Sequence, residues 1–60
     1  MKMYRIIKTA TKWYVFDKNR LDEFNNFDKK LVQKLYTVYA GTSYAALRKA
    51  KEFYNNKGVN

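Results

Sequence analysis

The sequence predicts a small α+β domain in which one amphipathic helix packs on an antiparallel sheet. Near the N-terminus, two runs rich in β-branched and aromatic residues, Lys2–Thr9 and Lys12–Asp17, follow each other closely, as the strands of a hairpin do. Near the C-terminus, alternating apolar residues over Leu35–Tyr39 give way after Gly41 to apolar residues spaced by three or four. That change of period indicates a strand followed by a helix.

The hairpin is the first element of the chain. Its junction lacks the Asn-Gly or Asp-Gly pair of a tight turn, so we expect a looser loop of about three to five residues. Both faces of the hairpin carry apolar side chains: Tyr4 and Ile6 lie on one side of the first strand, Met3 and Ile7 on the other. One helix covers only one face, so the second face must meet solvent, another subunit or a ligand.

The middle segment, Asp17–Gln33, allows two interpretations. Its apolar residues recur every three or four positions, which fits a helix. Asn25 and Asn26 are instead typical of a turn, with Leu21–Phe24 and Phe27–Leu31 as short strands on either side. We favour the second interpretation, because a second helix would leave only a three-stranded sheet to carry the many aromatic residues. The predicted order is therefore ββββα, with ββαβα as the alternative.

The C-terminal unit ends in the helix. Thr42 or Ser43 supplies a side-chain oxygen that can cap the first helical turn. The apolar stripe over Tyr44–Tyr54 predicts about three helical turns. Gly58 suits the C-terminal cap, and Lys57 is well placed against the helix dipole.

Composition limits the kind of protein. Sixty residues predict one domain over residues 1–60, and a chain of this size buries only about 60 % of the surface that its unfolded form exposes. The chain has no Cys and no His, so we expect no disulfide, no metal and no cofactor. Association of identical chains remains as a source of stability, so we expect a homo-oligomer. No signal peptide or membrane span is visible, so we expect a cytoplasmic protein with no membrane partner.

Charge and aromatic residues point to nucleic acid. Lys and Arg outnumber Asp and Glu by 13 to 5, and a polyanionic partner would relieve the self-repulsion of a +8 chain. Rings interleaved with cations are the composition of surfaces where bases stack on aromatics and Lys or Arg follow phosphates. In the alternative interpretation, the same rings fill the core and a subunit interface. The predicted contacts, with DNA favoured over RNA, are Arg5, Lys8, Lys12, Trp13, Tyr14, Arg48 and Lys51.

The chain offers few groups for catalysis. Without His and Cys, the Ser–His, Cys–His and zinc-water mechanisms lack their residues. Gly41 and Gly58 lie too far apart for a phosphate-binding loop. Asp17 is the one catalytic candidate, because with Asp22 or Glu23 it could hold a divalent metal and nick DNA. The alternative for Asp17 is a cap at the end of the strand or an ion pair with a neighbouring lysine.

The order of elements over nearly the whole chain, together with the segment VYAGTSYAALRKAKEFY, resembles that of very small ββββα proteins of phages and mobile elements. These are related to the single-stranded-DNA-binding domain of the transcriptional positive cofactor four family, and some mobile-element versions inhibit bacterial CRISPR nucleases. The resemblance implies sheet-mediated dimers or tetramers, contact with nucleic acid, and a role against a host defence nuclease or in DNA topology. An inhibitor that docks on a host nuclease without nucleic acid is the alternative.

Overall fold

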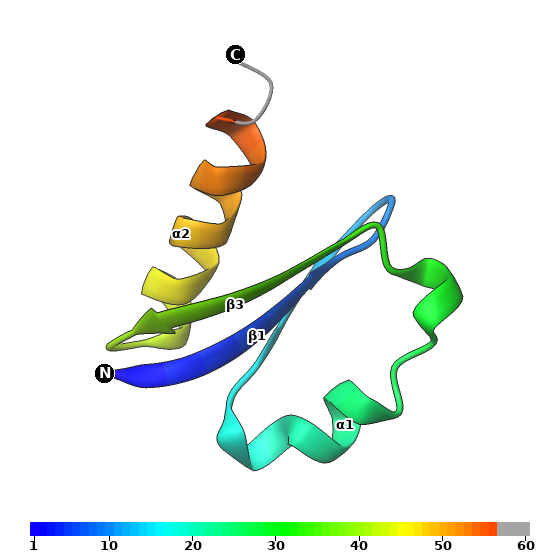
Figure 1. Ribbon diagram of the computed structural model, residues 1–60, viewed down its shortest axis with the longest axis horizontal. Helices are drawn as coiled ribbons and strands as arrows, with labels where there is room; N and C mark the ends of the chain where they lie inside the picture. The colour runs from blue at the N-terminus through cyan, green and yellow to red at the C-terminus, as the bar shows by residue number, and fades with distance from the viewer. Residues whose placement is uncertain (57–60) are drawn as a thin grey trace.

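A three-stranded antiparallel sheet and one long helix make up most of the computed structural model, which describes residues 1–56. The α+β class predicted from the sequence is confirmed. In chain order the elements are β1 (Lys2–Lys8), β2 (Trp13–Phe16), the 3₁₀ turn η1 (Lys18–Arg20), α1 (Leu21–Asn25), the 3₁₀ turn η2 (Lys29–Leu31), β3 (Lys34–Ala40) and α2 (Ser43–Asn56). Figure 1 shows α2 on one side of the strands and the segment that contains α1 on the other.

The hairpin of β1 and β2 forms as predicted, with residues 9–12 as its loop. The Thr9 N–H donates to the Lys12 carbonyl oxygen at 2.9 Å, and the Lys12 N–H donates back to the Thr9 hydroxyl at 3.0 Å. Thr9 is buried, so its hydroxyl closes the loop without an Asn-Gly pair. β1 is the central strand, because β3 pairs with its other edge, Ile6 opposite Tyr36.

The main core lies between the sheet and α2. Its helix side consists of Ala46 and Ala50, both fully buried, and side chains this small let the helix approach the sheet closely. Ile6 of β1 is also fully buried there. The buried residues of this cluster are Tyr4, Ile6, Val38, Ala40, Ala46 and Ala50.

The helix α2 agrees with its predicted stripe. Thr42 is its cap, because the Thr42 hydroxyl oxygen accepts a hydrogen bond from the Ala45 N–H at 3.1 Å, while Ser43 is already the first helical residue. The predicted C-terminal cap at Gly58 and the dipole contact of Lys57 lie outside the described residues. No helix within residues 1–56 is long and apolar enough to span a membrane.

The prediction of two strands in the middle segment is wrong. Residues 18–31 form α1 and two 3₁₀ turns, so the order within the described residues is closer to ββαβα than to ββββα. Asp17 and Asp28 explain the turns, because their carboxylates accept hydrogen bonds from the backbone N–H groups of Asn19 (2.9 Å) and Lys30 (3.0 Å). Such local bonds draw the backbone away from sheet pairing.

Candidate functional site

Strand alternation divides the predicted contact residues between the two faces of the sheet. Lys8 pairs with Trp13 on the face that α2 covers, whereas Arg5 and Tyr14 belong to the opposite face. We call that opposite face the outer face. It carries Arg5, Ile7, Tyr14, Phe16 and Leu35.

The middle segment packs against the outer face through two aromatic side chains. The Phe24 ring meets the Phe16 ring edge-on, with centroids 5.7 Å apart. The Phe27 ring meets Tyr14 at 5.0 Å and Phe16 at 6.2 Å. The second face, for which we predicted solvent, a subunit or a ligand, is therefore partly covered by the chain itself.

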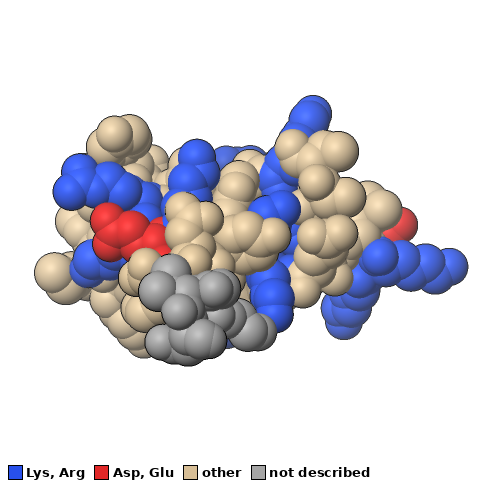
Figure 2. All heavy atoms as spheres, turned by 90° about the horizontal axis from the view of Figure 1, so that it is seen from above, with Lys and Arg blue, Asp and Glu red and all other residues tan. Residues whose placement is uncertain are grey.

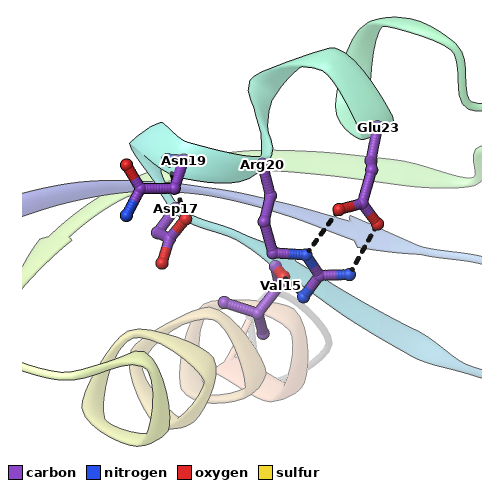
Figure 3. Close-up of polar contacts among 5 residues, drawn as sticks. All are labelled: Val15, Asp17, Asn19, Arg20 and Glu23. Atoms are coloured by element: carbon purple, nitrogen blue, oxygen red, sulfur yellow. Dashed lines mark hydrogen bonds and ion pairs between the residues drawn. The ribbon is translucent and has the colours of Figure 1, made fainter.

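Arg20 ties the middle segment to the edge of β2 (Figure 3). Its Nη1 donates to the Val15 carbonyl oxygen at 3.1 Å, and its Nε and Nη2 donate to the two carboxylate oxygens of Glu23 at 3.2 and 3.1 Å. Hydrogen bonding from Arg20 lowers the pKa of Glu23, and the same bond raises the pKa of Arg20. The guanidinium also lies over the Phe16 ring, 5.3 Å from its centroid.

A cavity of about 680 Å³ remains between the outer face and the middle segment. We call it the outer-face pocket. Its walls are mostly aliphatic and aromatic, and its cations are Arg5 and Lys29. The lining residues are Arg5, Ile7, Phe24, Asn25, Phe27, Lys29, Val32 and Leu35.

Arg5 is the unusual group of this pocket. Its guanidinium lies 5.3 Å from the centroid of the Phe24 ring, which it faces as a cation–π partner. Its Nε is shielded from solvent and has no hydrogen-bond acceptor among residues 1–56. A buried donor left unpaired costs about 1–3 kcal/mol.

A second cavity, of about 430 Å³, lies on the other side of η2. The turn separates the two cavities, because it contributes Lys29 to the first and Lys30 to the second. Lys12 and Tyr14 line this second cavity as well. The structure thus brings three of the predicted contact residues, Arg5, Lys12 and Tyr14, to the outer face and adds two lysines that the sequence analysis did not name.

Two of the predicted residues are engaged on the α2 side instead. The Lys8 ammonium donates to the Thr9 carbonyl oxygen at 2.9 Å and lies over the rings of Trp13 (5.7 Å) and Tyr54 (4.9 Å). The Trp13 ring stacks on Tyr36 with centroids 6.2 Å apart. Trp13 is therefore mainly a packing residue of the helix side.

The remaining predicted contacts, Arg48 and Lys51, lie on the exposed surface of α2. They border a small depression of about 100 Å³ together with Tyr44 and Leu47. Arg48 also approaches the Glu52 carboxylate at 3.9 Å, a surface ion pair of one helical turn. The seven predicted residues consequently fall on three different surfaces.

Asp17, the catalytic candidate, has a structural role here. Its carboxylate caps η1 through Asn19 N–H. Across residues 1–56, no three Asp, Glu, His or Cys side chains come together as a metal-ligand group. We therefore do not carry the nicking hypothesis forward.

Positive charge is widely distributed over the molecule. Figure 2 shows Lys and Arg across the full width of the face seen from above, with few Asp or Glu atoms between them. Comparisons with family models, with characterised proteins and with solved structures found no match. The resemblance to the positive cofactor four fold, and a role against a host nuclease, stay predictions.

Proposed function

We propose that the protein binds nucleic acid, DNA in the first instance, across its outer face and mainly through the phosphates. The observation that carries the proposal is the row of cations along the two adjoining cavities. Arg5 and Lys29 line one cavity, and Lys12 and Lys30 line the other. Aromatic rings from the hairpin and the middle segment stand beside them, which is the chemistry of surfaces that hold single strands.

Charge supports the same proposal. A chain of net charge +8 attracts phosphates over distances comparable to the Debye length, about 8–10 Å at physiological salt. Of the carboxylates nearby, Glu23 is paired with Arg20, and Asp28 accepts a hydrogen bond from the Lys30 N–H in η2. Counterion release from the bound strand then supplies most of the affinity.

The salt dependence of binding tests the proposal. Replacing Lys12, Lys29 and Lys30 by Gln removes three cations of the row. The slope of log K against log salt should fall by about 2, since each phosphate contact to a single strand contributes about 0.7. Fluorescence anisotropy with a labelled single-stranded oligonucleotide, at several salt concentrations, measures the slope.

The matched control removes the same charge elsewhere. Replacing Lys2, Arg48 and Lys51 by Gln leaves the outer face intact, because the last two side chains lie on α2 and Lys2 belongs to the α2 side of β1. In this control variant, the slope should change by less than half of the change expected for the Lys12, Lys29 and Lys30 variant. Equal changes in the two triple variants would contradict a defined interface, and binding that ignores salt would overturn the proposal.

We also propose that two copies associate along β3, as the expected homo-oligomer requires. β3 is an edge strand whose outer-face side chains Leu35 and Tyr39 are 50 % and 57 % exposed. Lys49 Nζ donates to the Tyr39 carbonyl oxygen at 2.8 Å, so this carbonyl points away from β1 and already has a partner. The odd-numbered residues of β3 therefore turn their backbone groups outward, and those of Thr37 can pair with Thr37 of a second β3.

The mass in solution tests this association. A second β3 running antiparallel and centred on Thr37 would place Thr37 opposite its own copy. Thr37→Lys should therefore set two like charges against each other and shift the measured mass to that of the monomer. Thr11→Lys adds the same charge in the exposed hairpin loop and should leave the measured mass unchanged. A parent chain that sediments as a monomer at micromolar concentration would overturn the association.

A further inference from the structure

We infer that the outer-face pocket binds a small organic anion with a flat apolar body, of the class of aromatic carboxylates and sulfonates. Such a ligand is not a nucleic acid, so this site goes beyond the proposed function and does not depend on it. The aromatic and aliphatic side chains of the pocket hold the apolar body, and the cations Arg5 and Lys29 attract the anionic group.

The pocket has the size and the lining of a small-molecule site. At about 680 Å³ it falls within the range of roughly 300–1,000 Å³ that such sites occupy. Phe24 and Phe27 line it from the middle segment, and Ile7 and Leu35 line it from the sheet. Leu35 is 50 % exposed, so a ligand laid against it removes apolar surface from water. The two Phe rings favour a flat aromatic body, because offset and edge-on ring pairs add to the gain from burial.

The charged residues that line the pocket are both cations. Arg5 and Lys29 contribute to its wall, and its described lining includes no Asp or Glu. Within residues 1–56, neither cation forms an ion pair with a carboxylate. Lys29 is exposed, so its ammonium can turn toward a ligand at the mouth, while Arg5 is half-buried on β1. A cleft with one sign of charge beside apolar walls concentrates ions of the opposite sign, so the pocket favours an anion over a neutral molecule of the same shape.

The turn η2 provides a comparison within the same molecule. Lys29 and Lys30 are adjacent and exposed, but Lys29 lines the outer-face pocket and Lys30 lines the second cavity. The one aromatic side chain of the second cavity is Tyr14, whose ring already has Phe27 against it, with centroids 5.0 Å apart. The same change of charge at these two positions therefore affects one cavity more than the other.

Three small molecules that differ in one property test the inference. 2-Naphthalenesulfonate has the rings and the charge, 2-naphthalenesulfonamide has the rings alone, and methanesulfonate has the charge alone. Each is titrated into the ¹⁵N-labelled chain at pH 6.5 and one low salt concentration, and ¹H–¹⁵N NMR gives the affinity and the location. 2-Naphthalenesulfonate should shift the amides of Ile7, Leu35 and residues 24–32 saturably and bind about fivefold tighter than the sulfonamide. Methanesulfonate should give no saturable shift, because it has no ring to bury.

Lys29→Glu is the decisive variant, because it replaces an attraction to the anion by a repulsion. It should weaken the binding of 2-naphthalenesulfonate about tenfold and leave the affinity for the neutral sulfonamide nearly unchanged. Lys30→Glu makes the same change of charge beside the other cavity and should weaken binding less than about threefold, since solvent screens the longer distance. Both side chains are exposed, so the two variants should fold like the parent.

The outcomes are separate from those that test the proposed function. Equal affinities for 2-naphthalenesulfonate and the sulfonamide overturn the inference, and so do equal effects of the two charge reversals. Saturable shifts confined to Tyr44, Leu47 and Arg48 also overturn it, because the ligand then occupies the depression on α2. A titration with 2-naphthalenesulfonate that shows no saturable shift overturns it outright. The salt-dependent binding of an oligonucleotide is measured independently, so the proposed function stands or falls by itself.

Discussion

The two faces of the sheet are covered in different ways. On one face, the 14-residue helix α2 sets two fully buried alanines against Ile6, which is itself 0 % exposed. On the outer face, three short turns lay the rings of Phe24 and Phe27 against the hairpin. The first covering is continuous, while the second leaves a cavity and the exposed side chains of Leu35 and Tyr39.

The difference separates a face that is covered by one long helix from a face whose covering leaves a cavity. The helix α2 sets two small, fully buried side chains against the strands, and the main cluster of buried residues lies between them. A covering of turns and ring edges cannot close over the whole face, so it leaves room for a ligand beside cationic groups. The α2 side should therefore dominate the free energy of unfolding, and the outer face should dominate recognition.

The largest expected effect is on the α2 side. Ile6→Ala should lower the free energy of unfolding by about 2–5 kcal/mol, because a fully buried side chain leaves a cavity. Urea unfolding followed by circular dichroism measures the change. Leu31→Ala is the control, since the Leu31 side chain is 56 % exposed. That substitution should lower the free energy of unfolding by well under half as much. Equal losses in the two variants would break the comparison.

A smaller effect is expected from the outer face. Phe27 is only partly buried, so Phe27→Ala should cost about 1–2 kcal/mol, below the usual range of about 3–5 for a core Phe. Amide hydrogen exchange should rise in residues 18–33 and stay slow in β1. If exchange rose equally in both regions, the outer covering would be part of the main core, contrary to the comparison.

The smallest effect concerns the ion pair that holds the turns to β2. The pKa of Glu23 is lowered in the folded state, so its stabilisation is fully present above the unfolded value of about 4.3. It is lost as the pH falls through the lower folded pKa. Glu23→Gln should be slightly less stable than the parent at pH 7, and the difference should shrink below pH 4.

Thermal unfolding between pH 2.5 and 7 measures that difference. The side chains of Arg20 and Glu23 are 50 % and 61 % exposed, so the difference in stability should be small, as it is for surface ion pairs. Asp22→Asn is the control, because Asp22 lies in the same helix, whereas the Arg20 guanidinium donates its hydrogen bonds to Glu23 and Val15. A Glu23→Gln difference that grew as the pH fell would contradict the assignment.

Local sequence patterns were enough to predict the hairpin of β1 and β2 and the unit of β3 and α2. Thr42, placed after Gly41, was recognisable as a cap, and the stripe around Ala46 and Ala50 gave the buried side of the helix. Strand alternation places Arg5 and Lys8 on opposite faces, a separation that the list of predicted contacts did not make. These features depend on residues a few positions apart, which is the range over which sequence patterns are informative.

The middle segment was predicted wrongly because its aromatic residues were assigned to strands. Phe24 and Phe27 find their partners on β2, and the capping carboxylates of Asp17 and Asp28 make helical turns the local solution. Because the segment was assigned to strands, Lys29 was not predicted as a pocket residue. A signal was present, because Asp followed by polar residues is typical of a turn that its carboxylate caps.

The sequence by itself determined the charge of the chain, the positions of its hairpin, of the strand before Gly41 and of its long helix, and the absence of Cys and His. Only the tertiary structure decided which cations share a surface and that a cavity forms between the turns and the sheet. The physical reason is that strand and helix formation follow from neighbouring residues, whereas the environment of Arg5 depends on Phe24, which a different element carries to it.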